Sequence, residues 1–227
     1  MKKSSKVILL VFLVLFVDQV LKIWIKTHMW IGEEIEILGL DWARIHFVEN
    51  NGMAFGLSFG GPYGKLILSL FRVIAIGFLI YLIRSFIKAD VKWGVLVGFA
   101  LILAGAIGNM LDSAFYGLLF SESAPHPGGV ARFLPAEGGY AGFLFGKVVD
   151  MFYFPMFRGY WPDGLPFIGG RPYRFFKPVF NVADMAITFG VLNILIFQRS
   201  FFFHEQGAEE TTIDNAPSES EETTEEE

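Results

Sequence analysis

The 227-residue chain is 53% hydrophobic and 17% aromatic, and its mean hydropathy of +0.49 excludes an ordinary soluble domain and indicates an integral membrane protein. The net charge of −5 comes from the segment 204–227, which holds ten acidic residues and no Lys or Arg, whereas the remainder has 18 basic and 13 acidic residues. The overall charge therefore indicates no acidic protein partner, and no nucleic-acid partner is expected. The absence of cysteine excludes disulfides, thiolate nucleophiles and thiolate metal sites.

The first apolar run predicts a membrane span at 7–25. Three lysines precede it, as in a secretory signal peptide, but no small-residue cleavage site follows and apolar character resumes after Asp18. At about 1.5 Å per residue the run is long enough to cross the hydrocarbon. Asp18 and Lys22 are spaced i,i+4 with the acid first, so they share a helix face and can neutralise each other. Bracing an active site near the outer end of the span is a compatible second role.

The loop 26–65 contains two short strand-like segments, Glu34–Leu38 and Arg44–Val48. They predict a small extracytoplasmic β-rich segment after the first span. The loop then contains Asn50-Asn51-Gly52, a turn signal between apolar segments. On spacing alone, the two asparagines are equally well interpreted as turn residues or as functional amides.

Two further apolar runs predict spans at 66–83 and 93–111. Arg72 interrupts the first of them, where it either snorkels outward or pairs with a carboxylate. The connection between the two runs carries three basic residues, which together with the basic amino terminus indicate the cytoplasmic side for both. The second run contains glycine and alanine at spacings that let helices approach closely, so we expect it to be the central packing element.

The segment 113–178 is rich in Gly, Pro and aromatic residues, which suits a long outer loop lying against the membrane interface. A fourth span is predicted at 179–197. The acidic segment 204–227 has too little apolar surface to fold and is expected to be a disordered cytoplasmic tail. Apart from the small β-rich segment, the sequence thus predicts an all-α membrane protein with four transmembrane helices, in which residues 1–203 form the membrane domain.

Asp184 lies in the fourth predicted span, about 7 to 8 Å from its start. A carboxylate inside a span costs several kcal/mol unless it has a partner or a function. Because four spans with the amino terminus inside place both long loops outside, several polar residues fall on one membrane face: Asn50, Asn109, Asp112, Asp150 and Asp184. We therefore expect Asp150 and Asp184 to meet.

Two carboxylates a few ångström apart at a membrane surface do not both ionise easily, because like charge and partial desolvation each favour keeping one proton. One can then take a proton from water while its protonated partner polarises a scissile carbonyl, which is aspartic-protease chemistry. Nearby amides such as Asn50, Asn109 and Asn181 could stabilise an oxyanion or hold a carboxylate in place. On the residues alone, two unrelated structural carboxylates are an equal alternative.

Five segments of the chain resemble, in order, the sequence blocks of lipoprotein signal peptidase (signal peptidase II). They are Asp18 to Lys22, Asn50-Asn51-Gly52-Met53-Ala54-Phe55, Gly105-Ala106-Ile107-Gly108-Asn109-Met110-Leu111-Asp112, Gly146-Lys147-Val148-Val149-Asp150 and Phe180-Asn181-Val182-Ala183-Asp184. The resemblance runs from the first span to the fourth. It implies a four-span enzyme of the bacterial cytoplasmic (inner) membrane with its active site toward the outer face. Such an enzyme removes the signal peptide of a prolipoprotein on the amino side of a diacylglyceryl-modified cysteine.

The same resemblance implies that Asp150 and Asp184 are the catalytic pair. The supporting or substrate-binding residues that it implies are Asn50, Gly52, Asn109, Asp112, Asn181, Asp18 and Lys22. The implied partners are a diacylglyceryl-modified prolipoprotein as substrate and membrane lipid. A monomer is expected, and the resemblance implies neither a metal nor a cofactor.

The chain departs from the family pattern in three ways. The family usually has Arg directly after the aspartate of its G-N-x-x-D block, where this chain has Ser113, so the expected cationic contact must come from elsewhere, and the candidates are Arg132, Lys147 and Arg72. The stretches from Asp112 to Asp150 and from Asp150 to Asp184 are longer than the family norm and therefore carry insertions. The acidic tail is an addition that we expect to be dispensable for catalysis.

Other functional classes fit the sequence less well. A transporter would distribute polar residues through the depth of several helices, whereas here they cluster toward one end, and a scaffold protein has no need for aligned acid and amide blocks. The segment 56–60 fits the G-x-S-x-G pattern of serine hydrolases but lacks the α/β context that this pattern requires. The four histidines are scattered, and His204-Glu205 has no second histidine four positions on, which disfavours a metalloprotease.

Overall fold

The computed structural model describes residues 1–52, 61–175 and 178–199. Its helices are α1 (Lys3–His28), α2 (Gly61–Lys88), α3 (Trp93–Leu111) and α5 (Val182–Leu192). Helix α3 continues through a π-helical turn, η2 (Asp112–Tyr116), into α4 (Gly117–Leu119), and α5 continues through a second one, η3 (Asn193–Phe197). By length and composition, the segments able to cross a membrane are Lys3–His28, Tyr63–Lys88 and Trp93–Leu119, and Val182–Phe197 is a shorter apolar helix.

Helix α3 lies at the centre of the helical part and contacts α1, α2 and α5. Its glycines explain how closely the neighbouring backbones approach. A Cβ at Gly105 would meet the backbone of Ala183 and the Ile187 side chain of α5, and a Cβ at Gly108 would come within 2.8 Å of the Asp18 carboxylate of α1. The expectation that the run 93–111 is the central packing element is thus confirmed, because its small residues allow two helices to pack against it at once.

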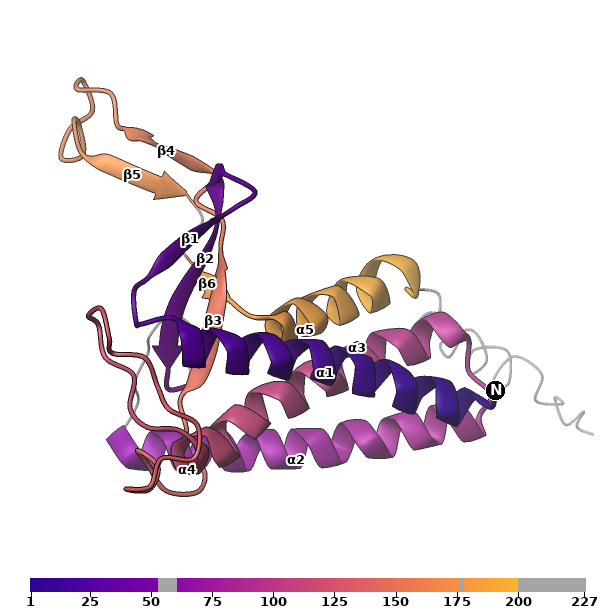
Figure 1. Ribbon diagram of the computed structural model, residues 1–227. Helices are drawn as coiled ribbons and strands as arrows, with labels where there is room; N and C mark the ends of the chain where they lie inside the picture. Colours follow the sequence, from indigo (N-terminus) through magenta and orange to yellow (C-terminus); the bar gives the residue numbers. More distant parts are fainter. Residues whose placement is uncertain (53–60, 176–177, 200–227) are drawn as a thin grey trace, which may run out of the picture.

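A four-stranded antiparallel sheet lies at one end of the helices, opposite the amino terminus (Figure 1). Its strand order is β1 (Glu34–Ile37), β2 (Leu40–Asn50), β3 (Val148–Tyr153) and β6 (Val179–Phe180). Two further strands, β4 (Phe157–Tyr160) and β5 (Pro172–Phe175), form a hairpin that projects from the sheet in Figure 1. The sheet thus combines the loop after α1 with two pieces of the long segment between α3 and α5.

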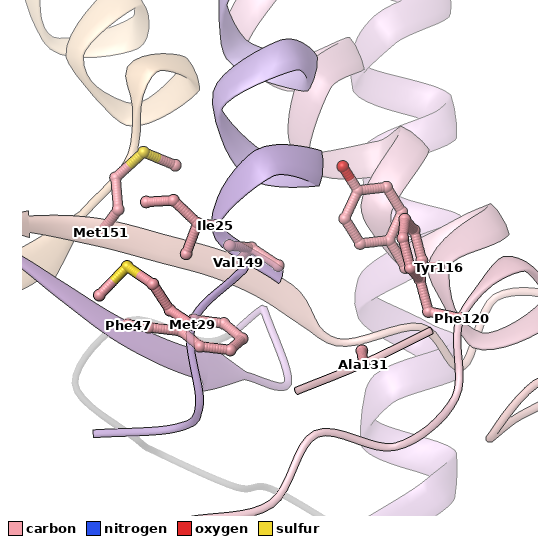
Figure 2. Packing of buried hydrophobic residues seen from close by; sticks show 8 residues of the cluster. All are labelled: Ile25, Met29, Phe47, Tyr116, Phe120, Ala131, Val149 and Met151. Carbon is pink, nitrogen blue, oxygen red and sulfur yellow. The ribbon is translucent and has the colours of Figure 1, made fainter. Parts of the chain in front are cut away.

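A buried apolar cluster joins the sheet to the carboxyl-terminal ends of α1 and α3 (Figure 2). Its members come from α1 and the residue after it, β2, β3, η2 and the segment after α4: Ile25, Met29, Phe47, Tyr116, Phe120, Ala131, Val149 and Met151. Figure 2 shows Val149 between Ile25 of α1 and the rings of Tyr116 and Phe120. Since each of these side chains is at most 3% exposed, their burial fixes β3 against the helices and so fixes the position of Asp150 on that strand.

The helix and strand boundaries correct several expectations. The predicted span 93–111 matches α3, and α1 and α2 extend beyond 7–25 and 66–83 at both ends. The fourth helix begins at Val182 rather than Val179, because Val179 and Phe180 pair with β3. The expected β-rich segment after the first helix exists as β1 and β2, but the all-α description is too simple. Strand β3 comes from the segment 113–178 that was expected to be an outer loop, and β6 comes from the first two residues of the predicted fourth span. The predicted tail 204–227 and the segment 56–60 lie outside the described residues.

Candidate active site

The start of α5 places Asp184 through a local hydrogen-bonding motif. Asn181 caps the helix: its Oδ1 accepts from the backbone N–H of Asp184 at 2.9 Å, and the Asp184 carboxylate accepts from the backbone N–H of Asn181 at 3.4 Å. This reciprocal capping box satisfies backbone donors at the helix terminus. Asp184 therefore lies in the first turn, about 3 Å along the helix, and not the 7 to 8 Å expected from a span beginning at Val179.

Strand β3 places Asp150 beside β2. Val48 pairs with Asp150 and Asn50 with Val148, so Asn50 and Asp150 are diagonal neighbours on one face of the sheet. The Asn50 Nδ2 donates to Asp150 Oδ2, and the Asn181 Nδ2 donates to Asp150 Oδ1 at 2.7 Å. Asp150 is 3% exposed. Each oxygen of this buried carboxylate therefore has a hydrogen-bond donor from an asparagine side chain.

Asn109 and Asn181 connect the two carboxylates. The Asn109 Nδ2 donates to Asp184 Oδ1 at 2.8 Å, and its Oδ1 accepts from Asn181 Nδ2 at 3.1 Å. The hydrogen bonds therefore run from Asp150 through Asn181 and Asn109 to Asp184. Asp150 and Asp184 are 34 positions apart in the sequence. This geometry agrees with the expectation that they meet.

The surroundings of Asp150 favour its protonated form. Burial raises the pKa of the Asp150 carboxyl from 3.8 to about 7, and the negative charge of Asp184 acts in the same direction. The hydrogen bonds from Asn181 and Asn50 and the charge of Lys22 lower this pKa and so oppose the shift. Near neutral pH, the Asp150 carboxyl can thus hold a proton beside a second carboxylate.

A buried ionic cluster surrounds the asparagine pair. Lys22 Nζ lies 2.9 Å from Asp18 Oδ2 and 2.8 Å from Asp112 Oδ2, and all three side chains are fully buried. Lys22 also donates to Asn109 Oδ1 at 3.1 Å. The two carboxylates bind neighbouring backbone: Asp18 accepts from the N–H of Ala183 at 2.9 Å, and Asp112 from that of Val149 at 3.3 Å. The pairing of Asp18 with Lys22 that their spacing predicted is therefore confirmed. The two residues also join α1 to α3 and α5.

Gln19 is part of this cluster and was not predicted. Its Nε2 donates to Asp112 Oδ1 at 2.9 Å and to Asp18 Oδ2 at 3.1 Å, and its Oε1 accepts from Tyr116 Oη at 3.1 Å. Its position directly after Asp18, inside an apolar run, was the available signal, because an amide in a span requires partners.

A second buried ion pair, between Lys26 and Glu49, was also not predicted. Lys26 is fully buried and its Nζ donates to Glu49 Oε1 and to Ser123 Oγ, the latter at 3.0 Å. The same Nζ lies 5.0 Å from the centroid of the Tyr140 ring. This pair ties α1 to the end of β2 directly before Asn50, and ties both to the segment between α4 and β3.

Comparison with known proteins identifies the family. The family model described as Signal peptidase (SPase) II matches residues 10–201. The chain belongs to the signal peptidase II family. It is similar to a protein of Porphyromonas gingivalis named lipoprotein signal peptidase, at 48% identity over 188 residues that cover 82% of this chain and 80% of the relative. A protein of Amoebophilus asiaticus with the same name is 37% identical over 203 residues, covering 88% of this chain and 80% of the relative.

The fold of this signal peptidase II is similar to that of two solved structures, each described as a bacterial membrane enzyme. One has a TM-score of 0.53 at 24% identity and covers 96% of this chain and 95% of its own. The other has a TM-score of 0.53 at 27% identity, and the match covers 86% of this chain and 93% of the chain in that structure. With the apolar helices described above, the family membership makes this chain a bacterial membrane enzyme.

Three cations were considered as the source of the cationic contact that is expected near Ser113, and the structure distinguishes among them. Arg132 pairs with Glu137 on the surface, and Lys147 lies near Glu49 and Glu122. Arg72 is the one that reaches Ser113: its Nη1 donates to the serine Oγ at 3.1 Å. In this signal peptidase II, a guanidinium from α2 therefore lies beside the position where the family pattern has arginine.

Proposed function

We propose that this chain is an intramembrane aspartic endopeptidase that removes the signal peptide from prolipoproteins, cleaving on the amino side of a diacylglyceryl-modified cysteine. Its relatives in the same family are named lipoprotein signal peptidase. The observation that carries the proposal is the hydrogen-bonded connection between Asp150 and Asp184 through Asn181 and Asn109. Asp150 and Asp184 are the proposed catalytic pair.

The two carboxylates have different surroundings, which suggests different roles. Asp150 is buried and its pKa is raised to about 7, so we assign it the proton that polarises the scissile carbonyl. Asp184 is partly exposed and takes a proton from the attacking water. The water oxygen then bonds to the carbonyl carbon as the Asp150 proton passes to the carbonyl oxygen. Asp184 then gives its proton to the amide nitrogen while one hydroxyl proton of the intermediate returns to Asp150, so that the C–N bond breaks and both carboxyl groups regain their starting protonation states.

The neighbouring amides and ions support this pair. Asn50 and Asn181 orient Asp150, Asn109 orients Asp184, and Gly52 allows the turn that presents Asn50. The cluster of Asp18, Lys22 and Asp112 holds the backbone of β3 and α5 on either side of the pair. Such prior orientation of catalytic groups lowers the cost of reaching the transition state.

The proposal includes a membrane orientation. Four spans, with α5 and η3 as the fourth, place the amino terminus in the cytoplasm and the sheet and the catalytic pair at the outer face. Lys3 Nζ binds Asp90 Oδ1 at 2.7 Å, which supports a common side for the amino terminus and the basic α2–α3 connection. The exposed apolar side chains along α1 and α2 suit contact with lipid. The chain works as a monomer on a lipid-modified substrate.

The test is cleavage of a diacylglyceryl-modified prolipoprotein by purified wild type, Asp150→Asn and Asp184→Asn. We expect both variants to lose at least about 10³-fold in kcat, with melting in detergent unchanged or raised. Asp163→Asn, in the exposed loop between β4 and β5, is the matched control and should retain wild-type turnover. Near-wild-type activity in either catalytic variant would exclude the carboxylate pair, and a transport function would then have to be tested.

A further inference from the structure

Arg72 is a charged residue inside an apolar membrane helix, next to the proposed catalytic pair. A charge inside a membrane span is costly unless it has a partner or a role. Its guanidinium is partly buried and donates in two directions: Nη2 donates to the backbone carbonyl of Gly52 at 2.6 Å and Nη1 to Ser113 Oγ at 3.1 Å. Ser113 in turn donates to the backbone carbonyl of Asn109 at 3.1 Å. The guanidinium thus joins the turn after β2 to η2, the continuation of α3.

Gly52 connects this guanidinium to the catalytic pair through Asn50. The backbone N–H of Gly52 donates to Asn50 Oδ1, which leaves the Asn50 Nδ2 directed at Asp150. Gly52 has a φ of +84°, a conformation in which glycine carries no steric cost. A Cβ at this position would lie 2.7 Å from Arg72 Nη1, so the close approach of the guanidinium also requires glycine.

We propose that Arg72 is a positioning residue that clamps the Asn50–Gly52 turn to Ser113 and so holds the Asn50 amide against Asp150. This inference rests on the proposed function, because it assigns Arg72 a role in orienting one of the two proposed catalytic carboxylates. The planar guanidinium can donate from two nitrogens to acceptors on two different elements, which an ammonium group on a shorter side chain cannot reproduce with the same geometry.

The alternative role for Arg72 is its charge alone. The carboxylates that interact electrostatically with Arg72 are those of Asp184, Asp112 and Asp150. The charged groups that act on Asp150 are Asp184 from α5, Lys22 from α1 and Arg72 from α2. A lysine at position 72 keeps the positive charge but loses the hydrogen bonds to both Gly52 and Ser113. This substitution therefore separates the effect of those hydrogen bonds from the effect of the charge.

The first experiment compares Arg72→Lys and Arg72→Met with wild type in cleavage of a diacylglyceryl-modified prolipoprotein. We expect both to lower kcat by about 10- to 100-fold, because a displacement of about 1 Å in a catalytic group has effects of this size, with less than about a threefold change in KM. Arg84→Met, on an exposed position twelve residues further along the same helix, is the matched control and should behave as wild type. Melting in detergent verifies that each variant is folded.

The second experiment tests whether Arg72 acts through Asn50. Asn50→Ala removes a donor whose hydrogen bond lowers the pKa of Asp150. Because the proposed mechanism needs Asp150 protonated, the loss of activity at high pH should move to higher pH in Asn50→Ala. Arg72→Lys should move it in the same direction. In an Asn50→Ala background, Arg72→Lys should reduce kcat by less than about threefold, since the contact that it disturbs is already absent.

Two results would overturn the clamp. One is a wild-type kcat and pH profile in Arg72→Lys, which would leave only a role for the charge. The other is a full 10- to 100-fold loss from Arg72→Lys in the Asn50→Ala background, which would show an action independent of Asn50. Failure of the proposed function looks different: Asp150→Asn or Asp184→Asn would remain active, whatever the behaviour of the Arg72 variants.

Discussion

The side chains of Asn109 and Asn181 are hydrogen-bonded to each other: Asn181 Nδ2 donates to Asn109 Oδ1 at a distance of 3.1 Å. Each asparagine also holds one aspartate: Asn109 donates to Asp184 and Asn181 to Asp150. Since Asn181 is in addition the N-cap of α5, one residue both starts the helix and joins the two halves of the site. Its roles in stability and in catalysis can be separated by choosing the substituted side chain.

Asn181→Ser and Asn181→Ala should therefore differ in stability but not in activity. Serine is a good N-cap and alanine is not, so only the alanine variant should lose about 1 kcal/mol of stability from the cap. Neither side chain can donate to Asp150 while bonding Asn109, so both should lose at least about 100-fold in kcat. Thermal melting and steady-state cleavage measure the two effects. Wild-type turnover in the serine variant would show that the asparagine acts only as a cap.

The stability of Asp150→Asn relative to wild type should increase as the pH rises. The pKa of Asp150 is raised in the folded state to about 7 from 3.8, so its favourable contribution is present below pH 4 and is lost as the pH rises to about 7. The full shift corresponds to on the order of 4 kcal/mol. Melting temperatures of the variant and the wild type should thus diverge between pH 5 and pH 8. An equal difference at both pH values would contradict the raised pKa.

Gly52→Ala should reduce kcat at least about tenfold, because alanine would strain the turn and its Cβ would displace the Arg72 guanidinium. Gly39→Ala is a matched control: Gly39 has a φ of +72° in the turn between β1 and β2, but a Cβ there has no atom within 4 Å. Both variants should lose about 1 kcal/mol of stability. Only Gly52→Ala should lose turnover, and equal turnover in the two would argue against the displacement of Arg72.

Moving the arginine to position 113 should restore part of the activity lost in Arg72→Met. Ser113 Oγ lies 3.1 Å from the Arg72 guanidinium, so a longer cationic side chain from position 113 can reach the same region. We expect Arg72→Met/Ser113→Arg to recover at least about tenfold in kcat over Arg72→Met, because an arginine fork can again donate to the turn. Steady-state cleavage by the single and double variants measures this. No recovery would mean that the approach from α2 is essential.

Glu49→Gln should be strongly destabilising, by about 3 to 5 kcal/mol, because it leaves the buried Lys26 without its charged partner. The control is Glu122→Gln, in which a side chain that is 71% exposed loses a contact with Lys147. That change should cost less than about 1 kcal/mol. Melting in detergent compares the two variants. Similar effects would show that water reaches the Lys26–Glu49 pair.

Several parts of the fold and site could be predicted because they depend on local spacing. The i,i+4 relation of Asp18 and Lys22 already places them on one helix face, and the small residues of 93–111 indicate a packed helix. The start of the fourth helix was predicted three residues too early. That error arose because Val179 and Phe180 are apolar enough for a span, and their pairing with β3 is a long-range contact.

The sequence by itself determined the membrane class and the central helix, because hydrophobic periodicity and residue chemistry are local properties. The convergence of Asp150 and Asp184 was inferred from the predicted topology and the supporting residues from the family resemblance. Only the tertiary structure decided that Arg72 faces Ser113 and Gly52, that Lys26 pairs with Glu49, and that β3 lies beside β2. These outcomes depend on the rotation of each helix about its axis and on strand register. Both are set by side-chain packing between segments far apart in the chain, which no local pattern records.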